Sequence, residues 1–313
     1  TAGGLMAKEL IHVNEKWSIL RCVGEMRKQA EDVDKVYTIY VVDDNQILLG
    51  TLSLKKLLLS PEKNFIKDIY NEKVISVKAN FDDEEVANIM DKYDLIVLPV
   101  VDDLNRLIGR ITIDDVVDVM KEEAMEDYNK ASGISEQVDS SDNIVTLTRA
   151  RLPWLLIGLM GGIMGAQVMG IFDIANNIEL AFFTPLIAAM GGNVGVQSAA
   201  IIVQGLASNS LGMDTLSERL FKELGVAMLN GIICSGIIML ITFLLGYPSA
   251  IYFTVSISIM AVIIFAALFG TFVPLALNKY KIDPALATGP FITTTNDIIG
   301  LLIYFLIGMA IYF

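Results

Sequence analysis

The last long apolar segment of the chain carries one carboxylate, Asp297, near its middle. Residues 284–313 are long enough to cross a bilayer as a helix, where an ionised side chain costs several kcal/mol. We therefore expect Asp297 to face a bundle interior or a water-filled path, with Thr293, Asn296 and Gly300 beside it. Carboxylate, hydroxyl, amide and backbone oxygens suit Mg²⁺ or Ca²⁺ better than a soft metal. The segment predicts an intramembrane cation site; the alternative is a buried Asp hydrogen-bonded to a neighbouring helix.

Two amides lie at membrane depth in an earlier apolar segment, residues 180–207. Asn193 and Gln197 are four residues apart, which places them on one helical face. Buried amides need hydrogen-bond partners, so we expect both to share a polar environment with Asp297.

Glycine and proline near these polar residues suggest an irregular backbone. Gly191 and Gly192 are expected to interrupt their helix and free carbonyls, and Pro290 to do the same before Asp297. Small residues also serve ordinary close packing of membrane helices. The predicted pore-lining residues are Thr293, Asn296, Gly300, Asn193, Gln197, Gly191 and Gly192.

The composition indicates a membrane protein with a soluble N-terminal part. The mean hydropathy is +0.56 and 54% of the residues are hydrophobic. Only five of the 23 Lys and Arg residues and seven of the 36 Asp and Glu residues follow position 150. The apolar runs cover residues 152–172, 180–207, 220–246, 251–277 and 284–313. We expect an acidic soluble module followed by an all-α transmembrane domain of five helices, residues 151–313.

Basic residues occupy alternate connections between these runs. They are Arg149 and Arg151, then Arg219 and Lys222, then Lys279 and Lys281. The other two connections hold no Lys or Arg, so the positive-inside rule places the N-terminal module in the cytoplasm. Five spans put the C-terminus on the opposite side of what we expect to be the plasma (inner) membrane.

The charge and the few sulfur and imidazole groups exclude several function classes. A net charge of −13 argues against nucleic acid, whose phosphates need a basic surface. His12 is the single histidine, and Cys22 and Cys234 lie in different parts of the chain, so no zinc site and no disulfide are expected. An enzyme is the weakest interpretation, because the sequence shows no nucleophile–base pair and no phosphate-binding loop.

The acidic module contains a tandem repeat. Residues 41–58 read VVDDNQILLGTLSLKKLL and residues 100–117 read VVDDLNRLIGRITIDDVV. Each copy is typical of strand, turn, strand and helix, with an amphipathic helix before it. A unit this short buries too little surface alone, so the two copies are expected to pack as one α+β body.

A helix rich in acids follows the second repeat. Its acids are Asp114, Asp115, Asp118, Glu122, Glu123, Glu126 and Asp127, and Lys121 is the one cation among them. Acids three and four residues apart repel one another, so this face is either solvated or neutralised by cations. Residues 128–150 are expected to break near Ser132 and Gly133 and then to form a connecting helix.

The repeat resembles the CBS domain pair over residues 13–127, and residues 1–12 are expected to be the remnant of a preceding segment. CBS pairs commonly dimerise and bind a ligand, often an adenine nucleotide, through a Ser or Thr followed three residues later by Asp. Thr112 and Asp115 match this pattern, whereas the first copy has Ser53 with Lys56 in the Asp position. The resemblance thus implies ATP as a candidate ligand; a plain helix cap at Thr112 is the alternative.

Almost the whole chain resembles the MgtE family of magnesium channels. The resemblance rests on the order of the modules and on PLIAAMGGNVGVQSA, FKELGVAMLNG, DPALATGP and TTTNDIIGLLIY. It implies a homodimer whose pore follows the two-fold axis, with Asp297 holding a largely hydrated Mg²⁺. It also implies closure by cytoplasmic Mg²⁺ bound to Asp94, Asp115, Asp118, Glu123, Glu126 and Asp127. Family members usually carry an acidic helical N-terminal domain, and TAGGLM resembles the junction after it.

Two other functions stay open at this point. A proton- or sodium-coupled carrier would use Asp297 as a proton relay and would depend on a second ion gradient. A membrane-anchored nucleotide or cation sensor would show no transport at all. Flux measurements discriminate among the three functions.

Overall fold

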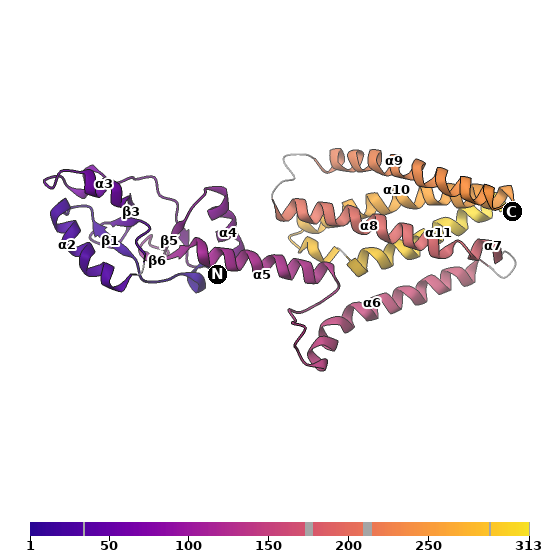
Figure 1. Cartoon of the computed structure of the whole chain (residues 1–313), viewed down its shortest axis with the longest axis horizontal. Coiled ribbons are helices and arrows are strands. Elements are labelled where there is room, and N and C mark those ends of the chain that lie inside the picture. Colours follow the sequence, from indigo (N-terminus) through magenta and orange to yellow (C-terminus); the bar gives the residue numbers. More distant parts are fainter. Residues whose placement is uncertain (34, 173–177, 209–214, 288, 313) are drawn as a thin grey trace. The chain divides into compact units, whose positions relative to one another are not determined.

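The computed structural model divides the chain into two compact units, Thr1–Ala124 and Met125–Phe313 (Figure 1). It describes residues 1–33, 35–172, 178–208, 215–287 and 289–312. The first unit combines strands and helices, and the second is helical. The predicted change from an α+β module to an all-α domain is confirmed.

The N-terminal unit contains two three-stranded sheets of the same topology. The strands are β1 (Ile11–Asn14), β2 (Ile39–Val42) and β3 (Leu48–Leu52) in one sheet, and β4 (Val77–Lys78), β5 (Val97–Val101) and β6 (Leu107–Thr112) in the other. In each sheet the first two strands are parallel and the last two are antiparallel. The parallel pairs are joined through α2 (Ile19–Gln29) and α4 (Asp83–Lys92), while α3 (Leu54–Leu59) and α5 (Ile113–Ala131) follow the hairpins. The tandem repeat is therefore a structural repeat.

The Asp-Asp turn of each repeat has the same backbone geometry. Asp43 Oδ1 accepts hydrogen bonds from two N–H groups of its own turn, and Asp102 Oδ1 does the same. Gln46 and Asn105 both lie in the left-handed region, with φ of 67° and 59°. The two turns also pair with each other, since the Leu107 N–H donates to the Gln46 carbonyl at 2.9 Å. The duplicated turn thus joins the two copies into one body.

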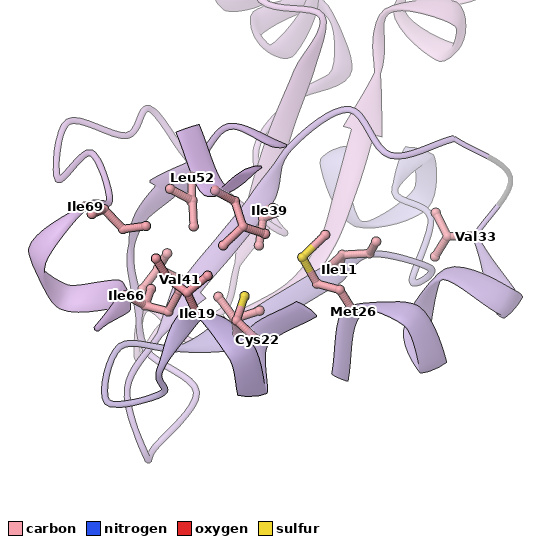
Figure 2. Packing of buried hydrophobic residues seen from close by; sticks show 12 residues of the cluster. Ile11, Ile19, Cys22, Met26, Val33, Ile39, Val41, Leu52, Ile66 and Ile69 are labelled. Atoms are coloured by element: carbon pink, nitrogen blue, oxygen red, sulfur yellow. The ribbon is translucent and has the colours of Figure 1, made fainter. Parts of the chain in front are cut away.

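Each repeat has its own apolar core. In the first, Cys22 and Met26 of α2 point toward strand residues (Figure 2). Other members of that core are Ile11, Val13, Ile19, Ile39, Val41, Leu52, Leu57, Ile66 and Ile69. Burial raises the pKa of the Cys22 thiol to about 11, which suits a packing role rather than a reactive one.

The first residues of the chain belong to the second repeat. The short helix α1 (Ala2–Leu5) places Ala2, which is fully buried, in the second core. The Ala2 N–H donates to the Phe81 carbonyl at 2.8 Å, and Ala7 pairs with Arg110 of β6. The start of the chain thus packs on the second repeat through Ala2, Leu5 and Met6, whereas Ile11 of β1 lies in the first core.

The C-terminal unit holds five helices long and apolar enough to span a membrane. The helices are α6 (Ile144–Ile171), α7 (Ile178–Ala181) with α8 (Thr184–Ala207), α9 (Leu216–Leu244), α10 (Ser249–Lys279) and α11 (Gly289–Tyr312), the last preceded by η4 (Pro284–Ala287). Helix α10 packs against α8, α9 and α11, and α6 packs against α11. The five predicted spans are confirmed by length and composition.

The segment before the first span differs from the expected connecting helix over residues 128–150. Helix α5 continues to Ala131, and the break comes at Gly133, whose φ is +74°. Residues 132–143 lie outside helices, and the Asn143 side chain caps α6 by accepting from the Thr146 N–H at 3.0 Å. The expected helix is therefore the end of one helix and the start of another.

Candidate functional site

Asp297 lies on α11 and faces a glycine of α8. It is half-buried, and a Cβ added at Gly192 would lie 3.2 Å from Asp297 Oδ1 and 3.1 Å from Thr293 Cγ2. The Thr293 hydroxyl donates to the Gly289 carbonyl at 3.0 Å, one turn earlier in the same helix. Because Gly192 has no side chain, the carboxylate of Asp297 has room between α11 and α8.

The glycine pair does not interrupt its helix. Helix α8 is continuous through Gly191 and Gly192, so the expectation of freed carbonyls there is wrong. Both glycines are buried, and a Cβ at Gly191 would lie 3.3 Å from the Asn296 carbonyl oxygen. Pro290 is also not an interruption, because it is the second residue of α11, where its missing N–H has no helical partner to lose.

Asn296 and Gly300 pack against neighbouring helices. Asn296 is 1% exposed, and a Cβ at Gly195 of α8 would overlap its Nδ2 atom. Gly300 packs on α10, where Val262 Cγ1 would lie 3.4 Å from a Cβ added to the glycine. The structure therefore places these two predicted lining residues in helix packing.

The amide of Asn296 is an unusual buried group. Among the described residues, neither its Oδ1 nor its Nδ2 atom has a hydrogen-bond partner. An unpaired buried amide costs about 1–3 kcal/mol, so this side chain is not there for stability alone.

Asn193 and Gln197 of α8 are exposed in the single chain. They lie four residues apart on a helix that is long enough to span the membrane. Lipid offers amides no hydrogen bonds, so this polar stripe needs water or a protein partner at membrane depth. The two amides thus mark a face that one chain leaves uncovered.

The candidate nucleotide residues are engaged in helix capping. Asp115 Oδ2 accepts hydrogen bonds from the Thr112 N–H at 3.1 Å and from its hydroxyl at 2.6 Å. In the first repeat, Ser53 accepts from the Lys56 N–H at 3.2 Å at the start of α3. These contacts favour the helix-cap alternative.

The predicted regulatory acids are divided between the two units, with Asp94, Asp115, Asp118 and Glu123 in the first and Glu126 and Asp127 in the second. Asp94 is exposed, with φ of 51°, and Asp118 pairs with Lys121 on its own helix at 3.1 Å. Over the described ranges, no three His, Cys, Asp or Glu side chains come together as a metal site.

One charged contact at the end of α5 is absent from the sequence prediction. Lys130 Nζ lies 2.5 Å from Asp283 Oδ2 and 2.7 Å from Glu126 Oε1. Burial opposes the charge of Lys130, but its hydrogen bonds to the two carboxylates outweigh this and raise its pKa. The only signal in the sequence was the Asp of DPALATGP, a charge directly before an apolar run.

Known proteins resemble this chain over nearly its whole length. One family profile, described as a divalent cation transporter and named MgtE, matches residues 184–307, and the CBS domain profile matches residues 2–62 and 66–122. The magnesium transporter MgtE of Bacillus subtilis is 33% identical over 99% of this chain and 69% of its own length. That of Thermus thermophilus is 36% identical, over 97% and 68%.

One solved structure is similar to part of this chain. The cytosolic domain of the Mg²⁺ channel MgtE in complex with ATP is 43% identical, and the match covers 38% of this chain and 48% of that chain with a TM-score of 0.36. The CBS pair, the five spans and the curated relatives together describe a multi-pass membrane protein with a cytoplasmic N-terminal module. The chain belongs to the MgtE family of magnesium transporters.

Proposed function

We propose that the protein is a Mg²⁺-selective channel that works as a homodimer, with Asp297 of two copies holding one largely hydrated Mg²⁺ on the two-fold axis. The observation that carries this proposal is the half-buried Asp297 of α11, which lies against the glycine face of α8, meaning Gly191, Gly192 and Gly195. The same helix α8 also carries Asn193 and Gln197. The names of the relatives support magnesium as the transported ion.

The chemistry of the site fits a hydrated ion. Mg²⁺ gives up its water reluctantly and is usually bound through one or two carboxylates with several waters retained. Two copies of Asp297 would supply two negative charges, which match the charge of one Mg²⁺. The glycine at position 192 leaves space beside Oδ1 that a larger side chain would fill. The pore site therefore selects an ion that is held through its water shell.

The uncovered amides support the dimer. Asn193 and Gln197 are exposed at membrane depth in the single chain, where lipid cannot satisfy them. A second copy around a two-fold axis would place four amides beside the two carboxylates. The same arrangement would give the ion a polar, wet path.

We further propose that cytoplasmic Mg²⁺ closes the channel through the acids of the CBS pair and α5. Asp118 has a single cation as partner, and Asp94 is exposed. Like charges disfavour a compact arrangement of these acids until cations neutralise them, so bound Mg²⁺ shifts the population toward that arrangement. Acids from two copies would supply the ligands that one chain does not gather.

Reconstitution into liposomes tests these proposals. Mg²⁺ flux should be present, should need no H⁺ or Na⁺ gradient, and should fall as Mg²⁺ on the cytoplasmic face rises. Flux that requires a second gradient would establish the coupled carrier instead, and absence of flux would establish the sensor. Asp297→Asn is the matched variant, because it keeps the size of the side chain and removes its charge.

ATP binding stays a prediction. Thr112 and Asp115 keep the expected spacing, yet Asp115 Oδ2 is occupied by bonds within its own turn. Titration with ATP would show binding that weakens in Asp115→Ala if the site exists.

A further inference from the structure

The end of α5 is fastened to the connection between α10 and α11 by one ammonium group. Lys130 Nζ contacts Asp283 Oδ2 at 2.5 Å and Glu126 Oε1 at 2.7 Å, and its side chain is 25% exposed. Asp283 uses its other oxygen to accept from the Ala285 N–H at 2.8 Å, at the start of η4. One carboxylate thus joins Lys130 to the segment that leads directly into α11.

The backbones beside this ion pair are in direct contact. Gly289, the first residue of α11, has a φ of +47°, and a Cβ there would overlap the Ala131 carbonyl oxygen. A Cβ at Gly133 would lie 2.7 Å from Pro290 Cγ. Neither glycine position has room for a side chain, so the end of α5 and the start of α11 are packed as closely as backbones allow.

The charges at this place favour separation unless a cation is present. Glu126, Asp127 and Asp283 supply three carboxylates, and Lys130 is the one cation that contacts them in the described part of the chain. Without the ammonium group, the carboxylate of Asp283 and those of α5 would repel one another.

We propose that Lys130 is a positioning residue of the channel gate, by which we mean the contact between the end of α5 and the start of α11. Its ammonium group holds these two segments together when no divalent ion is bound. The inference rests on the proposed channel function. Asp297 lies eight residues after Gly289 on one continuous helix, which is about 12 Å along its axis. A helix transmits a displacement of its first turn along its length, so Lys130 gives closure a component that does not depend on Mg²⁺.

Conductance without cytoplasmic divalent ions is the first test. With Mg²⁺ on the opposite face only, Lys130→Gln should conduct about fivefold more than the parent, the effect of losing one partly buried ion pair. Lys130→Arg should behave as the parent, because it keeps the charge. Lys121→Gln is the matched control, since Lys121 pairs with Asp118 within the exposed part of the same helix. Equal conductance of Lys130→Gln and Lys121→Gln would overturn the proposal.

Exchanging the charges of residues 130 and 283 distinguishes the loss of their ion pair from general damage to the fold. Lys130→Glu should conduct at least as much as Lys130→Gln, and Lys130→Glu with Asp283→Lys should return to the parent level. In this double variant the positive charge lies at position 283, and it would face the carboxylates at positions 126 and 130. A double variant that stays as open as Lys130→Glu would show that the contact is not electrostatic and would refute the tether.

Proteolysis tests the tether independently of transport. Cleavage after Glu136 requires the backbone between α5 and α6 to leave its packing, which includes the hydrogen bond from the Ser135 N–H to the Ala150 carbonyl at 2.9 Å, so a glutamate-specific protease reports the opening of the junction. In detergent and EDTA, the full-length Lys130→Gln variant should be cleaved there about fivefold faster than the parent and Lys121→Gln. Equal rates would overturn the proposal. If the parent carries no Mg²⁺ flux, the proposed function fails, while faster cleavage of Lys130→Gln still supports the tether.

Discussion

Three aspartates of the N-terminal unit and two asparagines of the C-terminal unit differ in whether the chain supplies their hydrogen-bond partners. In the N-terminal unit, Asp43, Asp102 and Asp115 each accept hydrogen bonds from neighbouring backbone or hydroxyl groups. In the C-terminal unit, Asn296 is buried without a hydrogen-bond partner among the described residues, and Asn193 is exposed on a helix that spans the membrane. The first group is explained by the fold, whereas the second has no structural explanation within one chain.

This contrast separates structural from functional residues. A satisfied Asp at a turn or cap stabilises its own element and needs no ligand. An unsatisfied amide or carboxylate at membrane depth is costly, so it is kept for something outside the chain, such as water, an ion or a second copy. Variants in the two units should therefore fail in different ways.

The largest effect is expected at Asp297. Asp297→Ala and Asp297→Asn should lower Mg²⁺ flux by about 100-fold or more, because the pore site loses its charged ligand. The melting temperature should stay near that of the parent, since no bond in the described structure depends on the carboxylate. Flux in liposomes and thermal unfolding in detergent measure the two quantities. A variant that conducts Mg²⁺ with unchanged affinity would show that Asp297 is not the pore ligand.

The glycine face of α8 should give the next largest effect, this time on stability. Gly195→Ala should destabilise the helical unit by roughly 1–3 kcal/mol, because the added methyl group meets Asn296. Gly236→Ala of α9 is the control, since its Cβ would point into open space. Unfolding in detergent should rank the two variants in this order, and equal stability would argue against the close contact of α8 and α11.

A smaller effect is expected at the cap of α5. Asp115→Ala should lower the stability of the N-terminal unit by about 1 kcal/mol, while Asp115→Asn, which keeps an acceptor oxygen, should lose less. Chemical denaturation measures both. A stable Asp115→Ala variant with weakened ATP binding would instead favour the nucleotide function for this residue.

The smallest effect concerns pH. Burial and the charge of Asp283 raise the pKa of Asp127, so its ionisation opposes folding above that pKa. The penalty disappears as the pH falls through the folded pKa, so Asp127→Asn should be slightly more stable than the parent at pH 7 and should lose this advantage in acid. Melting curves from pH 7 to pH 4 test the sign. A variant less stable than the parent at pH 7 would contradict the assignment.

Much of the architecture could be predicted because it depends on local patterns. The repeated VVDD turns predicted the repeat, and apolar runs predicted the spans. Side-chain direction along a span could not be predicted, since α8, α10 and α11 are apolar on nearly every face. Asn296 and Gly300 were expected to line the path with Asp297, and this stays a prediction; their contacts with α8 and α10 could not be read from the sequence.

Contacts between distant segments were also beyond prediction. The pairing of Lys130 with Asp283 joins residues far apart in the sequence. No spacing rule connects them. The continuity of α8 through Gly191 and Gly192 likewise depends on the helices that pack on these glycines, because isolated glycine pairs favour a break.

The proposed dimer requires the uncovered polar face of α8, formed by Asn193 and Gln197, to meet its counterpart in a second copy. The direct measurement is crosslinking of Asn193→Cys in membranes with a bifunctional maleimide, in a Cys22→Ala, Cys234→Ala background. Phe243→Cys on α9, also exposed, is the control for random collision. We expect Asn193→Cys to form covalent dimers and Phe243→Cys to stay monomeric. Monomeric Asn193→Cys beside a dimerising Phe243→Cys would contradict it.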